Sequence, residues 1–173
     1  MLSMFENTRE KITVHLIHDS TLNHENRKKL VQIVYKYDQE IEFYNVDELV
    51  PNKLKEIENA LPAARNYYGT IATMYRLFVP EFVSPDIKKM IYFDGDTIMN
   101  LDINELWQID LENFPIAAAN EFPTYSTQEA MNDMIPLCAN GRIDFKKYFN
   151  SGVLILNLDS TDIRGGTFSS ITA

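Results

Sequence analysis

The chain has 173 residues, of which 45% are hydrophobic and 24% charged, and its formal net charge is -9 at pH 7. This length and composition predict one globular domain with a sizeable core and argue against intrinsic disorder. Because nucleic-acid binders carry a basic face that displaces counterions, the acidic balance also argues against a nucleic-acid partner.

The first part of the chain predicts a strand, a helix and a second strand. Residues 11–18 mix β-branched and polar side chains, as a strand does before a loop. Asn23 is the expected N-cap of a helix over residues 24–37, whose apolar side chains recur at helical spacing. Residues 41–46 follow as the second strand.

The remaining elements continue this alternation. Residues 70–78 carry apolar side chains at helical spacing, and we expect this helix to stop before Pro80. A short apolar strand is predicted over residues 90–93, and two more strands are expected over residues 116–119 and 148–158. Strands that alternate with helices predict an α/β domain with a mostly parallel central sheet.

Cysteine usage and hydropathy bear on the compartment. Cys138 is the only cysteine, so it cannot form an internal disulfide, and a reducing compartment fits it best. No segment approaches the roughly 18 consecutive apolar residues of a membrane span. The first residues include charged side chains instead of the apolar run of a secretory signal. We therefore expect a cytoplasmic protein whose association with the inner face of a membrane, if any, is peripheral.

Two carboxylates separated by one glycine follow the strand predicted over residues 90–93. Asp94 and Asp96 can approach one hard cation, since Gly95 has no side chain that would obstruct the backbone bend or the ligand. Oxygen ligands suit Mg²⁺ or Mn²⁺. Open α/β sheets place their ligands at the carboxyl ends of strands, so the sequence predicts a metal site here.

The same residues admit two other interpretations. An Asp-Gly pair is also typical of a tight hairpin turn, whose arms would be residues 90–93 and 97–99. A calcium loop of the EF-hand type would need an oxygen-bearing side chain two positions beyond Asp96, where Ile98 stands. The pair alone does not decide between a metal site and a hairpin.

The segments around the pair resemble one family in several blocks that occur in the same order. The matching blocks are YGTIATMYRLFVPE (68–81), KKMIYFDGDTI (88–98), DINELW (102–107), IAAANE (116–121) and YFNSGVLILNL (148–158). Through them the chain resembles glycosyltransferase family 8, the retaining glucosyl- and galactosyltransferases, over roughly residues 1–158.

This resemblance implies a GT-A-type, Rossmann-like nucleotide-diphospho-sugar transferase domain. Such a domain would move glucose or galactose, with retention, from UDP-glucose or UDP-galactose to a surface polysaccharide, lipopolysaccharide or glycoprotein acceptor. Asp94 and Asp96 would hold Mn²⁺ or Mg²⁺, which would bridge the diphosphate and neutralise charge as UDP departs.

The resemblance also implies donor-binding roles for residues outside the DxD pair. Arg76 would reach the donor sugar or support the carboxylates, although a lone helical arginine is also typical of a charged surface. Asn150 would hydrogen-bond sugar hydroxyls and Gly152 would let the backbone come close, or the two would form a strand cap with a packing glycine. Glu121 would contact the sugar or be a solvated loop carboxylate.

Two aromatic residues near the predicted site, and the segment over residues 123–147, are not assigned to the site itself. Tyr92 and Trp107 have the character of core aromatic residues, so we place them outside the site. Residues 123–147 have no regular pattern and are predicted to be a helical excursion over the site.

Against the family pattern, residues 1–173 are expected to form a single but incomplete domain. The first strand with its uridine-binding aspartate, and a late segment with a metal-binding histidine and a diphosphate-binding lysine, have no match. We therefore expect this polypeptide alone to bind UDP and metal poorly. The alternatives are an inactive sugar-binding or partner-binding fragment, and a nucleotidyltransferase. The latter would need a basic or glycine-rich phosphate loop near an N-terminal strand, and none is seen.

Overall fold

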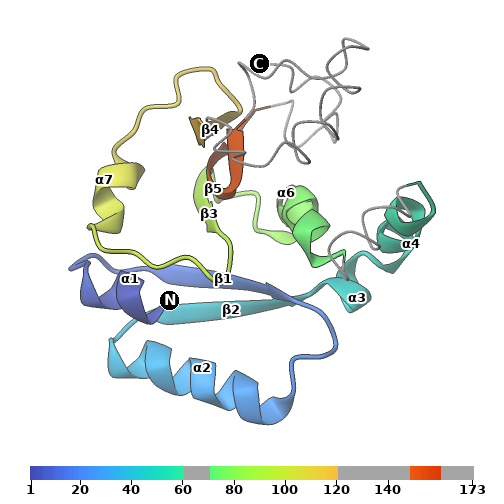
Figure 1. The fold of residues 1–173 in the computed structure, drawn as a ribbon, viewed down its shortest axis with the longest axis horizontal. Coiled ribbons are helices and arrows are strands. Elements are labelled where there is room, and N and C mark those ends of the chain that lie inside the picture. The colour runs from blue at the N-terminus through green and yellow to red at the C-terminus, as the bar shows by residue number, and fades with distance from the viewer. Residues whose placement is uncertain (61–70, 121–148, 161–173) are drawn as a thin grey trace, which may run out of the picture. The chain divides into compact units, whose positions relative to one another are not determined.

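The computed structural model describes residues 1–60, 71–120 and 149–160 (Figure 1). The chain divides into two compact units, and each is described by itself. Unit 1 comprises Met1–Asp86 and Ile98–Glu105, and unit 2 comprises Ile87–Thr97 and Leu106–Ala173. The single-domain organisation predicted for residues 1–173 stays a prediction.

A strand–helix–strand motif forms the sheet of unit 1 (Figure 1). The strands β1 (Thr13–His18) and β2 (Glu40–Asn45) pair in parallel, and α2 (His24–Lys36) connects them. The α2 helix begins as predicted, because the Asn23 side chain accepts a 2.8 Å hydrogen bond from the backbone N–H of Asn26. The predicted parallel pairing is confirmed in this unit.

Short helices complete unit 1 and carry most of its core. They are α1 (Leu2–Glu6), α3 (Val46–Leu49), α4 (Pro51–Ala60), the 3-10 helix η1 (Ala72–Phe78) and α6 (Val79–Phe82), with α7 (Ile103–Trp107) beginning in unit 1 and ending in unit 2. One apolar cluster joins α3, α4 and η1 through Val46, Leu54 and Phe78. A second joins α1 to α2 through Phe5 and Val34.

The helix predicted over residues 70–78 differs from the observed one in type. Its described part is the 3-10 helix η1, which ends at Phe78 before Pro80 as predicted, and a new helix, α6, begins at Val79 and contains Pro80. Proline is accommodated there because it occupies the first turn of a new helix, where its missing N–H has no intrahelical partner to lose.

Among the described residues, the sheet of unit 2 has three strands in the order β3-β5-β4. These are β3 (Lys89–Phe93), β4 (Ile116–Asn120) and the long central β5 (Phe149–Asn157), and both pairings are antiparallel. The prediction of a mostly parallel sheet therefore does not extend to this unit. A run of buried apolar residues such as Leu154, Ile155 and Leu156 indicates a central strand but does not encode its direction.

Two remaining expectations concern hydropathy and the loop. Within the described ranges, no helix is both long and apolar enough to cross a membrane. The excursion predicted over residues 123–147 lies outside the described residues.

Candidate metal and donor site

The carboxylate pair lies on a turn directly after β3. The backbone N–H of Asp94 donates to the carbonyl oxygen of Gly152 at 2.8 Å, which continues the β3–β5 pairing one residue past Phe93. The N–H of Thr97 then donates to the carbonyl of Asp94 at 3.0 Å and closes the turn. Since β3 pairs with β5 and residues 97–99 form no strand, the hairpin interpretation is wrong.

The Asp94 carboxylate is held from two directions. Its Oδ1 accepts a 2.7 Å hydrogen bond from the hydroxyl of Tyr92. On the other side lies Gly152, where an added Cβ would stand only 2.9 Å from Oδ2 of Asp94 and 3.0 Å from Oδ1 of Asn150. A side chain at residue 152 would therefore force a shift of the carboxylate or of the atoms around it.

Tyr92 was placed outside the site by its aromatic character, and its hydroxyl instead contacts Asp94. The signal that could have found it is spacing. Side chains at i and i+2 of a strand lie on the same face, so a tyrosine two residues before a carboxylate can reach it.

Asp96 and Gly95 are more open than Asp94. Asp96 is exposed, and no hydrogen bond or ion pair joins its side chain to another residue of the described ranges. A Cβ at Gly95 would meet nothing within 4 Å, and the backbone there is outside the left-handed region. The chain itself thus does not require glycine at 95 for the bend, and the open space is available to a ligand.

The other predicted donor-site residues divide between the two units. In unit 2, Oδ1 of exposed Asn150 accepts a 2.8 Å hydrogen bond from the N–H of Gly152, which is the capping role considered as its alternative. In unit 1, Arg76 lies on η1, and its Nε donates to the carbonyl of Thr73 at 2.8 Å. Glu121 lies outside the described residues.

The donor set fits a hard divalent cation. Asp94 and Asp96 would contribute carboxylate oxygens from two positions of one turn, on either side of Gly95, one carboxylate positioned and the other exposed. Among the residues that the structure describes, no group of three or more histidine, cysteine, aspartate or glutamate side chains could hold a metal. Mg²⁺ held by one or two carboxylates commonly completes its coordination with water and with phosphate oxygens of a ligand.

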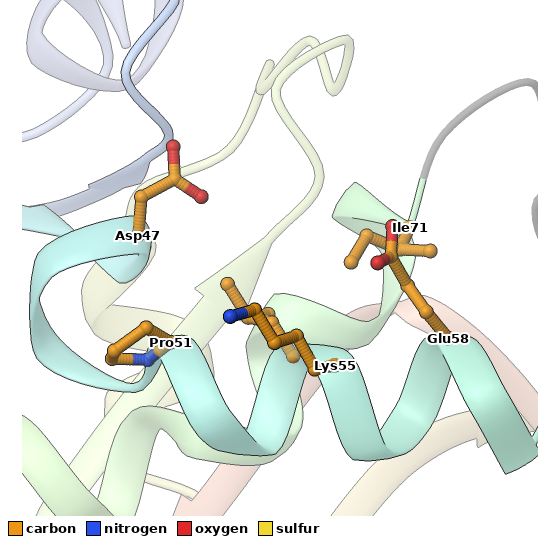
Figure 2. A pocket seen from close by; sticks show the side chains of 6 residues that line it. Asp47, Pro51, Lys55, Glu58 and Ile71 are labelled. Atoms are coloured by element: carbon orange, nitrogen blue, oxygen red, sulfur yellow. The ribbon is translucent and has the colours of Figure 1, made fainter.

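Unit 1 holds a separate pocket of about 280 Å³ (Figure 2). It is lined by Asp47, Pro51, Leu54, Lys55, Glu58 and Ile71. Figure 2 shows Lys55 and Glu58 projecting from α4, with Asp47 on the preceding short helix. None of the predicted site residues lines this pocket.

A polar cluster at the end of β1 shares Asp47 with that pocket. Asp47 accepts a hydrogen bond from the N–H of Ser20 at 2.9 Å, and the neighbouring Asp19 accepts one from the hydroxyl of Tyr75 at 3.2 Å. Hydrogen bonds, first of all from the Thr21 hydroxyl, lower the pKa of Asp19. Burial, followed by the Asp19 charge, raises the pKa of Tyr75 to about 12. This cluster ties β1 to η1.

The sequence matches the model of a known protein family. This family model, described as glycosyl transferase family 8, matches residues 1–167. The chain belongs to this family. It is 30% identical over 159 residues to a putative glycosyltransferase of Haemophilus influenzae, covering 92% of this chain and 43% of the relative. It is also 29% identical over 143 residues to general stress protein A of Bacillus subtilis, covering 82% of this chain and 44% of the relative.

Plant relatives in the same comparison are named for galacturonic acid. The chain is 32% identical over 120 residues to the probable galacturonosyltransferase-like 9 of Arabidopsis thaliana, covering 65% of this chain and 27% of the relative. The chain thus spans less than half the length of the curated relatives it matches here.

Two solved glycosyltransferase structures superpose on most of the chain. The galactosyltransferase LgtC, determined with donor and acceptor sugar analogues, covers 90% of this chain and matches over 51% of its own length, with a TM-score of 0.62 and 22% identity. Mouse xyloside xylosyltransferase 1 covers 92% of this chain over 59% of its own, with a TM-score of 0.60 and 16% identity. At these identities the likeness shows the fold, and it confirms the predicted α/β GT-A class.

Proposed function

We propose that the protein is a hexosyltransferase that moves glucose or galactose from a UDP-sugar to a glycan or glycoprotein acceptor with retention at the anomeric carbon. One observation carries the proposal. In a chain of glycosyl transferase family 8, Asp94 and Asp96 lie on the turn at the end of β3, and Gly152 of β5 leaves room for the first of these carboxylates.

Each residue of the site receives a role from its surroundings. Asp94 and Asp96 hold Mn²⁺ or Mg²⁺, and this cation, when bound, supplies positive charge that stabilises UDP as the leaving group. Asp94 provides a positioned oxygen, since the Tyr92 hydroxyl donates to its carboxylate and Gly152 leaves the space in which that carboxylate lies. Asp96 is exposed and adjusts to the ligand, and the open space at Gly95 lets the diphosphate approach the backbone.

Three further residues complete the proposed donor site. Because Oδ1 of Asn150 already accepts from the N–H of Gly152, its amide nitrogen is the group that would donate to a sugar hydroxyl. Arg76 supplies a cation that suits a phosphate or a sugar hydroxyl, and Glu121 supplies a carboxylate acceptor for a sugar hydroxyl. These three roles rest on the family pattern.

The acceptor and the cellular setting are part of the same proposal. A surface polysaccharide, lipopolysaccharide or glycoprotein would receive the sugar, as in bacterial cell-surface glycan synthesis. The transferase would work in the cytoplasm, with peripheral contact to the inner face of the membrane. The presence of one cysteine, Cys138, in the sequence supports a reducing compartment.

Release of UDP from UDP-glucose or UDP-galactose in the presence of Mn²⁺ tests the proposal. Because the chain spans less than half the length of its relatives, the assay uses a full-length form of the transferase. We expect that form to release UDP from one of these donors, with a loss of at least about 100-fold in Asp94→Ala and Asp96→Ala, since each removes a ligand of the metal. Asp159→Ala is the matched control, because Asp159 is an exposed carboxylate of the same unit that pairs with Lys88 at 2.7 Å.

The outcomes separate the transferase from its alternatives. Release that survives both variants would contradict the metal roles of Asp94 and Asp96. Binding of a UDP-sugar without any release would replace the transferase with a sugar-binding fragment. The anomeric configuration of the product, read by nuclear magnetic resonance, decides retention.

A further inference from the structure

Tyr92 and Asp94 form a unit whose geometry is set by the sheet. Tyr92 is fixed on β3 by pairing opposite Leu154 of β5. Asp94 stands two residues later, and its backbone N–H is bound to the carbonyl of Gly152 at 2.8 Å. The phenol therefore reaches the carboxylate from a rigid strand, at 2.7 Å between the hydroxyl and Oδ1.

The two carboxylates of the pair are treated differently by the chain. Asp94 has its backbone tied to β5, one oxygen bonded to Tyr92 and the other facing the space that Gly152 leaves free. Asp96 is exposed, and within the described ranges its side chain makes no hydrogen bond or ion pair. The chain thus organises one ligand before any ion arrives and leaves the second adaptable.

We infer that Tyr92 is a positioning residue of the metal site, whose hydroxyl holds the Asp94 carboxylate over Gly152 in the orientation that binds the cation. The inference rests on the proposed function, since it concerns the same metal. Groups that orient a ligand without touching the metal typically change metal affinity by about 10–100-fold when they are removed. Phenylalanine would keep the ring on β3 and remove only the hydrogen-bond donor.

The test compares Tyr92→Phe with Tyr37→Phe. Tyr37 is a suitable control because its hydroxyl donates to a carboxylate in the same way, to Oε1 of Glu6 at 3.0 Å, but in unit 1. Manganese is titrated into each protein and followed by paramagnetic broadening of the backbone amide signals of Gly95 and Gly152. This readout detects weak binding and needs no donor or turnover. We expect about tenfold weaker binding in Tyr92→Phe and no change in Tyr37→Phe.

A double-mutant cycle shows whether Tyr92 acts through Asp94. In an Asp94→Ala background the positioned carboxylate is gone, so Tyr92→Phe should cause no further loss of Mn²⁺ affinity. A further loss of similar size would overturn the positioning role. Unchanged amide spectra away from the site establish that each variant is folded.

The outcomes for the metal site and for Tyr92 are distinguishable. Equal Mn²⁺ affinity of Tyr92→Phe and the unsubstituted chain, with a loss in Asp94→Ala, would overturn the role of Tyr92 and leave the metal site standing. Broadening that is absent near Gly95 in the unsubstituted chain would overturn both.

Discussion

The approach of Gly152 to Asp94 allows two glycine-to-alanine variants to be compared directly. In Gly152→Ala the new Cβ would lie 2.9 Å from Oδ2 of Asp94. If the carboxylate stays, overpacking costs about 1–3 kcal/mol. If it turns away, it loses the hydrogen bond from Tyr92, which is worth about 1 kcal/mol or more. In Gly95→Ala the Cβ would meet nothing within 4 Å.

Both variants replace glycine with alanine, so each lowers the conformational entropy of the unfolded chain by a similar amount. This entropy change therefore cancels when the stabilities of the two variants are compared. We therefore expect Gly152→Ala to be less stable than Gly95→Ala by about 1–3 kcal/mol. The assay is urea unfolding of both variants, followed by circular dichroism and analysed with a common slope. Equal unfolding midpoints would refute the claim that the space at Gly152 is reserved for the Asp94 carboxylate.

Three other predictions test the fold around the site. Asn23→Ala should destabilise α2 by about 1 kcal/mol in urea unfolding, whereas Asn23→Asp, which keeps the capping oxygen, should not. Tyr75 has a folded pKa of about 12, above the unfolded value of about 10, so the unfolded chain loses this proton first. The contribution of Tyr75 to the free energy of unfolding should be fully present below pH 10 and should be lost as the pH rises to about 12. Tyr75→Phe should abolish this part of the pH dependence of unfolding. Lys89→Ala should cost about 1 kcal/mol in urea, because its ammonium donates to the carbonyls of Trp107 and Ile109 at 2.6 Å. Lys88→Ala, which removes one exposed ion pair, should cost less, and equal costs would contradict this reasoning.

Local sequence signals predicted the strands and α2, but not the helices α3, α4, α6 and α7. An asparagine directly before an amphipathic segment is typically a helix N-cap, and Asn23 caps α2 as expected. The predicted strands of both sheets are present, because short apolar runs between polar loops leave few other options. Strand direction in unit 2 was not predictable, since burial of Ile155 and its neighbours reads the same in parallel and antiparallel sheets.

The site was predicted in part. Spacing alone placed Asp94 and Asp96 on one turn, and the structure shows that turn at the end of β3. The contact of Gly152 with Asp94 could not be derived from spacing. The two residues lie 58 positions apart in the sequence, and only the pairing of β3 with β5 brings them together. Tyr92 was placed outside the site because its aromatic ring suggested a core residue, whereas its hydroxyl donates to the Asp94 carboxylate.

In the proposed function, Asp94 and Asp96 together bind the cation that holds the diphosphate of the donor. Crystals grown with Mn²⁺ and UDP and measured at the manganese absorption edge would show whether they do. We expect an anomalous peak within bonding distance of a carboxylate oxygen from each residue and of a phosphate oxygen of UDP. A UDP molecule bound with its manganese peak away from both carboxylates would contradict it.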